Sequence, residues 1–185
     1  MDSSGYYDSR MVFRPEKLAW QKIKCIFNTW KIKMKAAYDY SFVCGAEALF
    51  NLALNDERRY ILPSVVEYDI LFDSGILTVR TEKGFKFDGR SGPKIIDWFA
   101  PNLGSLEERV AWHMHDALGY GQSLNFVQTN YALKFVLKDL ASYSNFKSEL
   151  IRNAVSLSKS WYGYPKPDDE WYCNVGKVRT SFHAF

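Results

Sequence analysis

Cysteine is scarce in this sequence of 185 residues, and its three cysteines lie far apart. Cys25, Cys44 and Cys173 form no C-x-x-C pair, so we expect no structural zinc site built on them. An odd number of cysteines without regular spacing also argues against a disulfide scaffold. A chain without such a scaffold is typical of a reducing compartment.

Long hydrophobic runs are absent as well. No stretch approaches about 18 uninterrupted apolar residues, so we expect no transmembrane segment. Met1 is followed by polar residues rather than by a basic and then an apolar region, so we expect no secretory signal peptide. The sequence also contains no internal repeat and no low-complexity tract. These features predict a protein that is compatible with the cytosol.

The composition is otherwise that of an ordinary globular domain, with 47% hydrophobic and 24% charged residues. Aromatic residues make up 17%, and we expect most of them to fill a core because aromatic rings bury the most area per residue. The net charge of +3 is too small to indicate nucleic-acid binding by the whole chain. The charge is uneven, however, since residues 10–35 hold eight Lys or Arg and only one acid, Glu16.

This basic region coincides with the first predicted helix, over residues 15–38. Pro15 fits the first helical position, and Glu16 is favourable in the first turn. Apolar residues follow at helical spacing along one face: Leu18, Ile23, Ile26, Phe27, Trp30 and Met34. Five residues are predicted to bind a partner: Lys17, Lys24, Trp30, Lys31 and Lys35. The helix could lie on a membrane surface or contact nucleic acid, or it could pack on the domain with its lysines in solvent.

A second, shorter helix is expected over residues 46–55, and the pattern then changes to that of strands. Apolar segments separated by turn signals such as Asp73-Ser74-Gly75 predict a small antiparallel sheet within residues 60–88. After Pro93 the spacing becomes helical again, and Ser105 is a suitable N-cap. The predicted helices of this part cover residues 106–118, 124–141 and 146–161.

The fold class is therefore α+β, with a small antiparallel β-sheet followed by about three helices and preceded by a basic amphipathic helix. We divide the chain into an N-terminal arm with basic amphipathic helices over residues 1–56, an α+β core domain over 57–163 and an aromatic C-terminal tail over 164–185. The tail is too aromatic to be a plain flexible segment, so we expect it to pack against another part of the protein.

His115 and Asp116 are the sharpest candidates for chemistry. A histidine titrates near neutrality, so His115 could act as a general base whose other ring nitrogen is oriented by a carboxylate. Ser91 lies in a predicted exposed turn and could join such a site. The carboxylates that could orient the ring are Asp88, Asp97 and Asp139. A half-buried histidine that is held by a hydrogen bond is the purely structural alternative.

The same helix offers little to a metal ion. Consecutive helical residues differ by about 100° in direction, so His113 and His115 lie roughly 200° apart and cannot bind one metal together. The H-E-x-x-H spacing of zinc enzymes is absent. A metal at His115 would need a further ligand, such as Asp88, Asp97 or Asp116. We predict neither a metal site nor a cofactor.

Two segments resemble a small family of unknown function that is found in bacteriophages and prophages. Residues 84–93, Gly-Phe-Lys-Phe-Asp-Gly-Arg-Ser-Gly-Pro, are similar to that family's G-F-x-x-D-G-x-S-x-P turn, and residues 115–118, His-Asp-Ala-Leu, are similar to its H-D-x-L helix. The resemblance covers about residues 57–163. This chain departs from the family at Arg90, where a small residue is usual, at Gly119, which replaces a tyrosine, and at Thr129-Asn130, which replaces Ala-Asp.

The resemblance implies a phage-encoded accessory or virion-associated protein, located in the host cytoplasm or in the virion. We expect it to act by protein–protein interaction with a phage structural protein or a host protein, either alone or as a homo-oligomer. The alternative is a small hydrolase in which His115 is the general base and Asp88 or Asp116 is its orienting group. In that hydrolase Ser91 and Arg90 would line the site.

Overall fold

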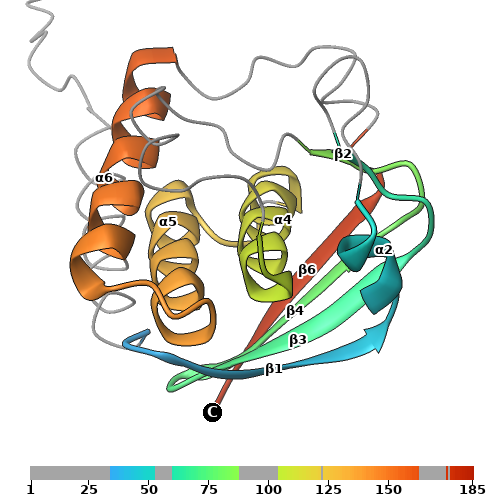
Figure 1. The fold of residues 1–185 in the computed structure, drawn as a ribbon, viewed down its shortest axis with the longest axis horizontal. Coiled ribbons are helices and arrows are strands. Elements are labelled where there is room, and N and C mark those ends of the chain that lie inside the picture. Colours follow the sequence, from blue (N-terminus) through green and yellow to red (C-terminus); the bar gives the residue numbers. More distant parts are fainter. Residues whose placement is uncertain (1–33, 53–59, 88–103, 122, 163–173, 175) are drawn as a thin grey trace, which may run out of the picture.

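The computed structural model describes residues 34–52, 60–87, 104–121, 123–162, 174 and 176–185. Its main element is a four-stranded antiparallel sheet in the order β1-β3-β4-β6. The strands are β1 (Ala37–Cys44), β3 (Val66–Phe72), β4 (Gly75–Thr81) and β6 (Val178–Ala184). Helices lie on one face of this sheet (Figure 1), which confirms the predicted α+β class.

The centre of the sheet is the predicted hairpin of β3 and β4. Phe72 pairs with Gly75, so the connection is the two-residue loop Asp73-Ser74. Alternate residues of β3 and β4 are buried, because successive side chains of a strand point to opposite faces of the sheet. The inner face carries Tyr68 and Phe72, whereas Glu67 and Asp69 lie on the other face. One face of the sheet therefore belongs to the core and the other meets solvent.

The two edge strands lie outside the range that the sequence predicts for the sheet. Residues 34–38 were predicted to end a helix, but residues 34–36 are not helical and residues 37 and 38 begin β1. Residues 15–33 of the predicted helix lie outside the described residues. The prediction was wrong here because β1 is rich in aromatic and β-branched residues, and its pairing with β3 outweighs the helical pattern. β6 comes from the predicted tail and pairs with β4. The sheet thus takes strands from all three predicted ranges.

The edge formed by β1 is covered by acidic side chains. The backbone N–H of Ala37 donates to Asp139 Oδ2 at 3.0 Å, and that of Tyr40 donates to Asp39 Oδ1 at 2.8 Å. The register of β1 is also irregular near both of its ends. Such an irregular register, and carboxylates that accept from backbone N–H groups of the strand, make an edge strand a poor template for pairing with another chain.

A second, two-stranded sheet joins β2 (Tyr60–Ile61) to β5 (Lys86–Phe87). Its free side is held by Asn174, which is fully buried. The side chain of Asn174 accepts from the N–H of Lys86 at 3.0 Å and donates to the carbonyl of Lys86 at 2.9 Å. One amide thus replaces the neighbouring strand that β5 lacks at this residue.

The three predicted helices after residue 104 are present. They are α4 (Leu106–Gly121), α5 (Phe126–Phe135), which continues into the π-helical turn η1 (Val136–Leu140), and α6 (Asn145–Tyr162). Ser105 Oγ accepts from the N–H of Glu108 at 3.2 Å, which confirms the predicted N-cap. α4 runs on through Gly119 to Gly121, further than predicted. The short helix α2 (Ala46–Phe50) begins as predicted, and its predicted end lies outside the described residues.

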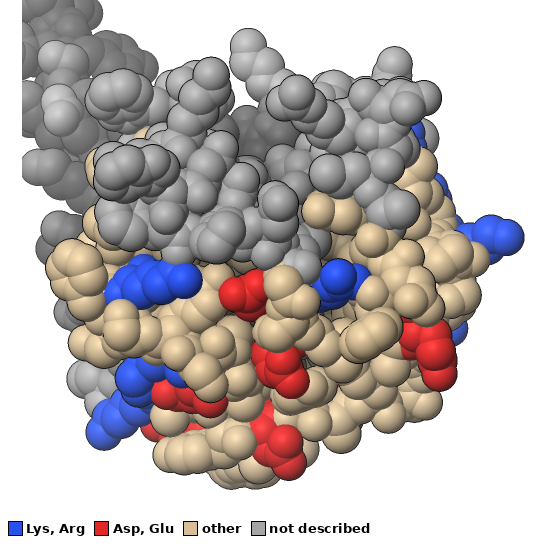
Figure 2. Space-filling view, viewed as in Figure 1, with Lys and Arg blue, Asp and Glu red and all other residues tan. Residues whose placement is uncertain are grey.

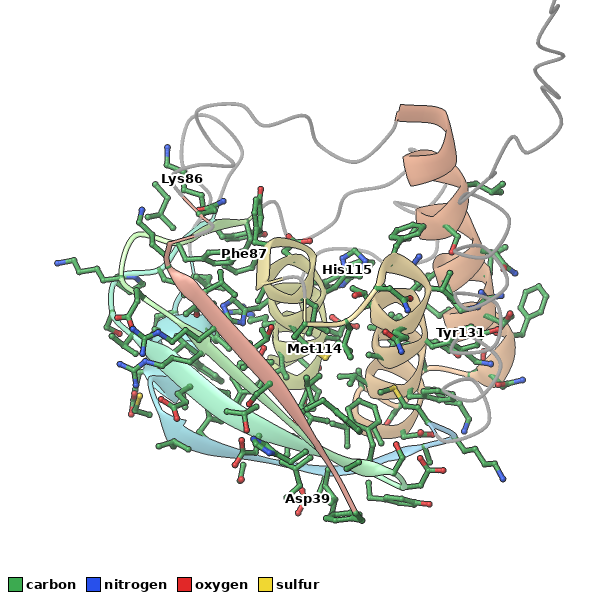
Figure 3. The ribbon with its side chains drawn as sticks, turned by 180° about the vertical axis from the view of Figure 1, so that it is seen from behind. Asp39, Lys86, Phe87, Met114, His115 and Tyr131 are labelled. Carbon is green, nitrogen blue, oxygen red and sulfur yellow. The ribbon has the colours of Figure 1, made fainter. Side chains whose placement is uncertain are left out.

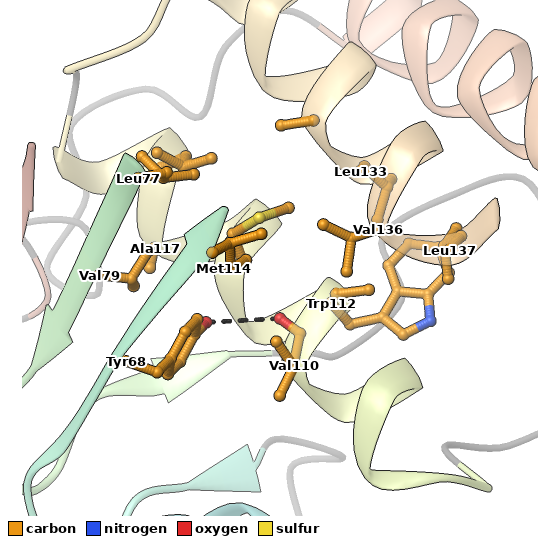
Figure 4. Close-up of a cluster of buried hydrophobic side chains, with 14 of the residues drawn as sticks. Tyr68, Leu77, Val79, Val110, Trp112, Met114, Ala117, Leu133, Val136 and Leu137 are labelled. Carbon is orange, nitrogen blue, oxygen red and sulfur yellow. Dashed lines mark hydrogen bonds between the residues drawn. The ribbon is translucent and has the colours of Figure 1, made fainter. Parts of the chain in front are cut away.

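The core lies between the sheet and α4, and it continues between α4 and α5. Leu77 and Val79 of β4 face Met114 and Ala117 of α4, while Leu133 on α5 closes the other side (Figure 4). All five side chains are fully buried. α6 packs on α5 and is the helix farthest from the sheet (Figure 1). Among the described residues no helix is both long and apolar enough to span a membrane, as predicted.

Asn174 provides a test of this arrangement. Asn174→Ala removes both partners of the Lys86 backbone and leaves buried polar groups unsatisfied, so we expect it to lower the free energy of unfolding by about 2–3 kcal/mol. Chemical denaturation measures this loss. The matched control is Asn51→Ala, at an exposed position, for which a change below about 0.5 kcal/mol is expected. Equal effects of the two changes would contradict the bridging role.

Candidate functional site

The structure describes only some of the predicted site residues. His115 and Asp116 lie in α4, whereas Asp88, Arg90, Ser91 and Asp97 lie outside the described residues. Of the predicted partner-binding residues, Lys35 is described and exposed, and its backbone N–H donates to Asp73 Oδ1 at 2.9 Å. The other four lie outside the described residues: Lys17, Lys24, Trp30 and Lys31.

His115 lies on the side of α4 that faces α5 (Figure 3), and it is only 2% exposed. Its Nε2 lies 3.0 Å from Oδ1 of Asn130 on α5, and its Nδ1 lies 3.2 Å from Oδ1 of Asp116. The ring of Trp112, one turn earlier, packs edge-on against the imidazole. Both ring nitrogens therefore have partners inside the protein.

The network continues from Asn130 to α6. Asn130 Nδ2 donates to Ser156 Oγ at 3.0 Å, and the Ser156 hydroxyl donates its one proton to the carbonyl of Arg152 at 2.8 Å. Because Ser156 Oγ can then only accept, the amide of Asn130 must turn its oxygen toward His115. That oxygen requires a donor, so the proton of His115 lies on Nε2.

This assignment leaves Nδ1 of His115 as the nitrogen that faces a carboxylate. Nδ1 of His115 lies 3.2 Å from Oδ1 of Asp116. Asp116 therefore contacts the nitrogen that a general base would use, and Asn130 takes the place behind the ring where an orienting carboxylate was expected. Asp139, another of the predicted alternatives, instead binds the N–H of Ala37.

Sequence reasoning missed the role of Asn130 and Ser156. Thr129-Asn130 stands out in the sequence only as a departure from the Ala-Asp step of the resembling family. The available signal was the position of a polar residue on the buried side of a helix, because a buried amide needs partners on neighbouring elements. Asn130 is 1% exposed, and its side chain joins α4 to α6.

His113 points the other way, toward the sheet. It is fully buried, with Nδ1 at 2.8 Å from the hydroxyl of Tyr68 and Nε2 at 2.9 Å from the hydroxyl of Thr81. The rings of Phe85 and Phe87 pack edge-on against it. Burial away from water lowers the pKa of His113 to about 3, despite the opposing effect of Asp116. This histidine is a neutral link between α4 and the sheet.

The described part of the surface in Figure 2 carries mixed charge. Acidic and basic side chains are interspersed over the described part of the face in Figure 2. Within the described part of the chain, no group of three or more His, Cys, Asp or Glu side chains is placed to hold a metal ion.

The low pKa of His113 predicts a loss of stability in acid. The folded pKa of about 3 lies below the ordinary 6.5, so the unfolded chain binds the proton more tightly. The free energy of unfolding should then be at its full value above pH 6.5 and should fall as the pH drops toward 3, by on the order of 4 kcal/mol from this residue alone.

Thermal unfolding across this pH range measures the effect against two variants. His113→Gln does not titrate, so its stability should depend less steeply on pH between 6.5 and 3. The matched control is His183→Gln on β6, where the histidine is exposed and its removal should leave the slope unchanged. Parallel slopes for the native protein and His113→Gln would contradict the assignment.

Asn130 generates a second expectation. Asn130→Ala removes the acceptor of the Nε2–H of His115 and the donor to Ser156 Oγ, and should lower the free energy of unfolding by about 2–3 kcal/mol. Imidazole ¹⁵N chemical shifts should show protonated Nε2 in the native protein and a redistribution of the proton in the variant. Asn153→Ala, at an exposed position on α6, is the control. A native spectrum with a bare Nε2 would refute the proton assignment.

No family model, curated protein or solved structure matches this chain. Neither the fold nor the His115 network therefore brings with it an activity that is known from another protein.

Proposed function

We propose that this protein acts by binding a macromolecular partner, as a phage-encoded accessory or virion-associated protein. The observation that carries the proposal is the closed state of the network around His115. Both ring nitrogens are within hydrogen-bonding distance of protein groups, and the side chain is 2% exposed. A general base needs one nitrogen within reach of a substrate proton. Here the network links three helices to one another instead.

The exposed apolar side chains support the same proposal. Tyr38 and Val43 on β1 are 63% and 64% exposed, and Phe146 on α6 is 76% exposed. Large apolar groups that remain in water lower the free energy when a partner covers them. The phage assignment rests on the resemblance of residues 84–93 and 115–118. It extends the binding proposal to a phage structural protein or a host protein in the cytoplasm or the virion.

A small hydrolase is the second candidate. It is favoured by the 3.2 Å approach of His115 Nδ1 to Asp116, because an imidazole beside a carboxylate is a common arrangement for acid–base chemistry. In this proposal Asp88 and Ser91 join the pair from the segment that follows β5. Asn130 then has the role of fixing the proton on Nε2.

The two candidates differ in their response to loss of the imidazole. The tagged full-length chain would be captured after cross-linking in cells that produce the phage, beside His115→Gln and a triple variant Lys17→Glu, Lys24→Glu and Lys31→Glu. For a binding protein we expect His115→Gln to capture as much partner as the native chain. The triple variant should capture at least ten-fold less. Circular dichroism would verify that both variants are folded.

The same preparations would be assayed for hydrolysis of carboxylic and phosphate esters. Two results together would favour the hydrolase over the binding proposal. Ester hydrolysis would have to disappear in His115→Gln, and none of the substitutions would change partner capture. If the triple variant captures the partner as well as the native chain does, the basic N-terminal residues are not part of the interface.

A further inference from the structure

The solvent face of the four-stranded sheet carries opposite charges on its two halves. The half formed by β1 and β3 holds Asp39, Glu67 and Asp69, and neither strand contains a basic residue. The half formed by β4 and β6 holds Arg80 and Arg179, and neither strand contains an acidic residue. These side chains share one face because directly paired residues of adjacent strands point the same way. No helix of the described part lies on this face (Figure 1).

An apolar pair lies at one end of the same face. Leu71 on β3 and Ile76 on β4 are directly opposite each other, beside the hairpin loop. Leu71 is 36% exposed, and Ile76 is half-buried. Phe185 is 81% exposed at this end of the sheet, where its N–H donates to the carbonyl of Ser74 at 3.2 Å. Covering such apolar groups with a second surface lowers the free energy.

A second copy of this face matches both features in one orientation. Stacked sheets keep their strand directions within about 30° of each other, so a two-fold axis between two copies runs either across the strands or along them. An axis across the strands places each strand over its own copy. Acids would then face acids, and the apolar pair would face Glu67 and Arg80 at the other end of the strands.

An axis along the strands has the opposite result. It places β1 over β6 of the second copy and β3 over β4, because the strand order is β1-β3-β4-β6. The acidic half of each copy then faces the basic half of the other. Leu71 faces Ile76 of the second copy, since the two residues lie at the same height along paired strands. Charge and apolar packing therefore favour the same axis.

We propose that the solvent face of the sheet is a homodimer interface whose two-fold axis runs along the strands. Arg80 keeps its ion pairs with Glu67 at 2.5 Å and Glu82 at 3.0 Å, so dimerisation breaks no contact of the single chain. From strand and residue spacing the face covers roughly 300–400 Å² per copy, which is less than a standard interface. The dimer is therefore weak, and the dilute chain is monomeric. This contact goes beyond the proposed partner binding and does not depend on it.

Sedimentation velocity of the full-length chain, from micromolar to millimolar concentration, tests the proposal. We expect the native chain to pass from monomer to dimer over this range. Leu71→Glu places an acid opposite Ile76 of the second copy and should raise the dissociation constant at least ten-fold. The matched control is Val127→Glu on α5, because Val127 is also 36% exposed but lies away from the sheet face. Its dimerisation should equal that of the native chain.

The direction of the axis is tested at two serines. Ser41 on β1 and Ser181 on β6 lie in one row at opposite edges of the sheet, about 14 Å apart within a chain. In the proposed dimer each faces the other residue of the second copy. Ser41→Lys with Ser181→Glu should therefore dimerise at least ten-fold more tightly than Ser41→Glu with Ser181→Glu. An axis across the strands would make both combinations repulsive.

Circular dichroism would verify that every variant is folded. The proposal is overturned if the native chain remains monomeric at millimolar concentration, or if Leu71→Glu dimerises as well as the native chain. It is equally overturned if the combination of Ser41→Lys and Ser181→Glu dimerises no more tightly than the combination with two glutamates. Partner capture that changes while sedimentation stays the same concerns the proposed function only.

Discussion

The packing of α4 on the inner face of the sheet is the contact on which the rest of the structure depends. α4 contributes fully buried side chains to the core, including Val110, Met114 and Leu118. Within this apolar layer His113 joins the hydroxyls of Tyr68 and Thr81, so a polar link fixes the position of the helix along the strands. A buried polar group is costly unless it is satisfied, which makes this one arrangement more favourable than a shifted helix.

The other face of the same helix organises the outer layer. His113 and His115 are two residues apart, and the helical geometry sends one toward the sheet and the other toward α5. Through Asn130 and Ser156, His115 then determines how α5 and α6 are placed. The histidine that sequence analysis singled out for catalysis thus lies at the centre of a structural network. Its Nδ1 also contacts the carboxylate of Asp116.

The predictable and the unpredictable parts of the fold differ in the range of the interactions behind them. The hairpin of β3 and β4, the three helices and the Ser105 cap follow from residues close together in sequence, and all were predicted. The edge strand β1 was missed because its stability depends on pairing with β3, about 30 residues away. β6 and Asn174 were missed for the same reason, since their partners lie about 90–110 residues earlier.

The candidate site divides in the same way. His115 and Asp116 are neighbours, and the sequence predicts their association. Asn130 lies 15 residues further along and Ser156 another 26, on two different helices, so nothing local indicates that they join one chain of hydrogen bonds. The opposite directions of His113 and His115 follow from helical rotation alone. Which ring nitrogen of His115 carries the proton depends on the orientation of the Ser156 hydroxyl, which lies far along the sequence.

The position of β6 has a consequence for the order in which the protein can be completed during synthesis. β4 is the second strand of an early hairpin, yet its outer neighbour is made about 100 residues later. Until residues 178–184 have left the ribosome, one side of β4 presents unpaired N–H and C=O groups beside an apolar face. Pairing of such distant segments is also slow, because a long loop must close first. The nascent chain therefore passes through a stage in which its central hairpin is open to strand exchange, and the last strand ends that stage.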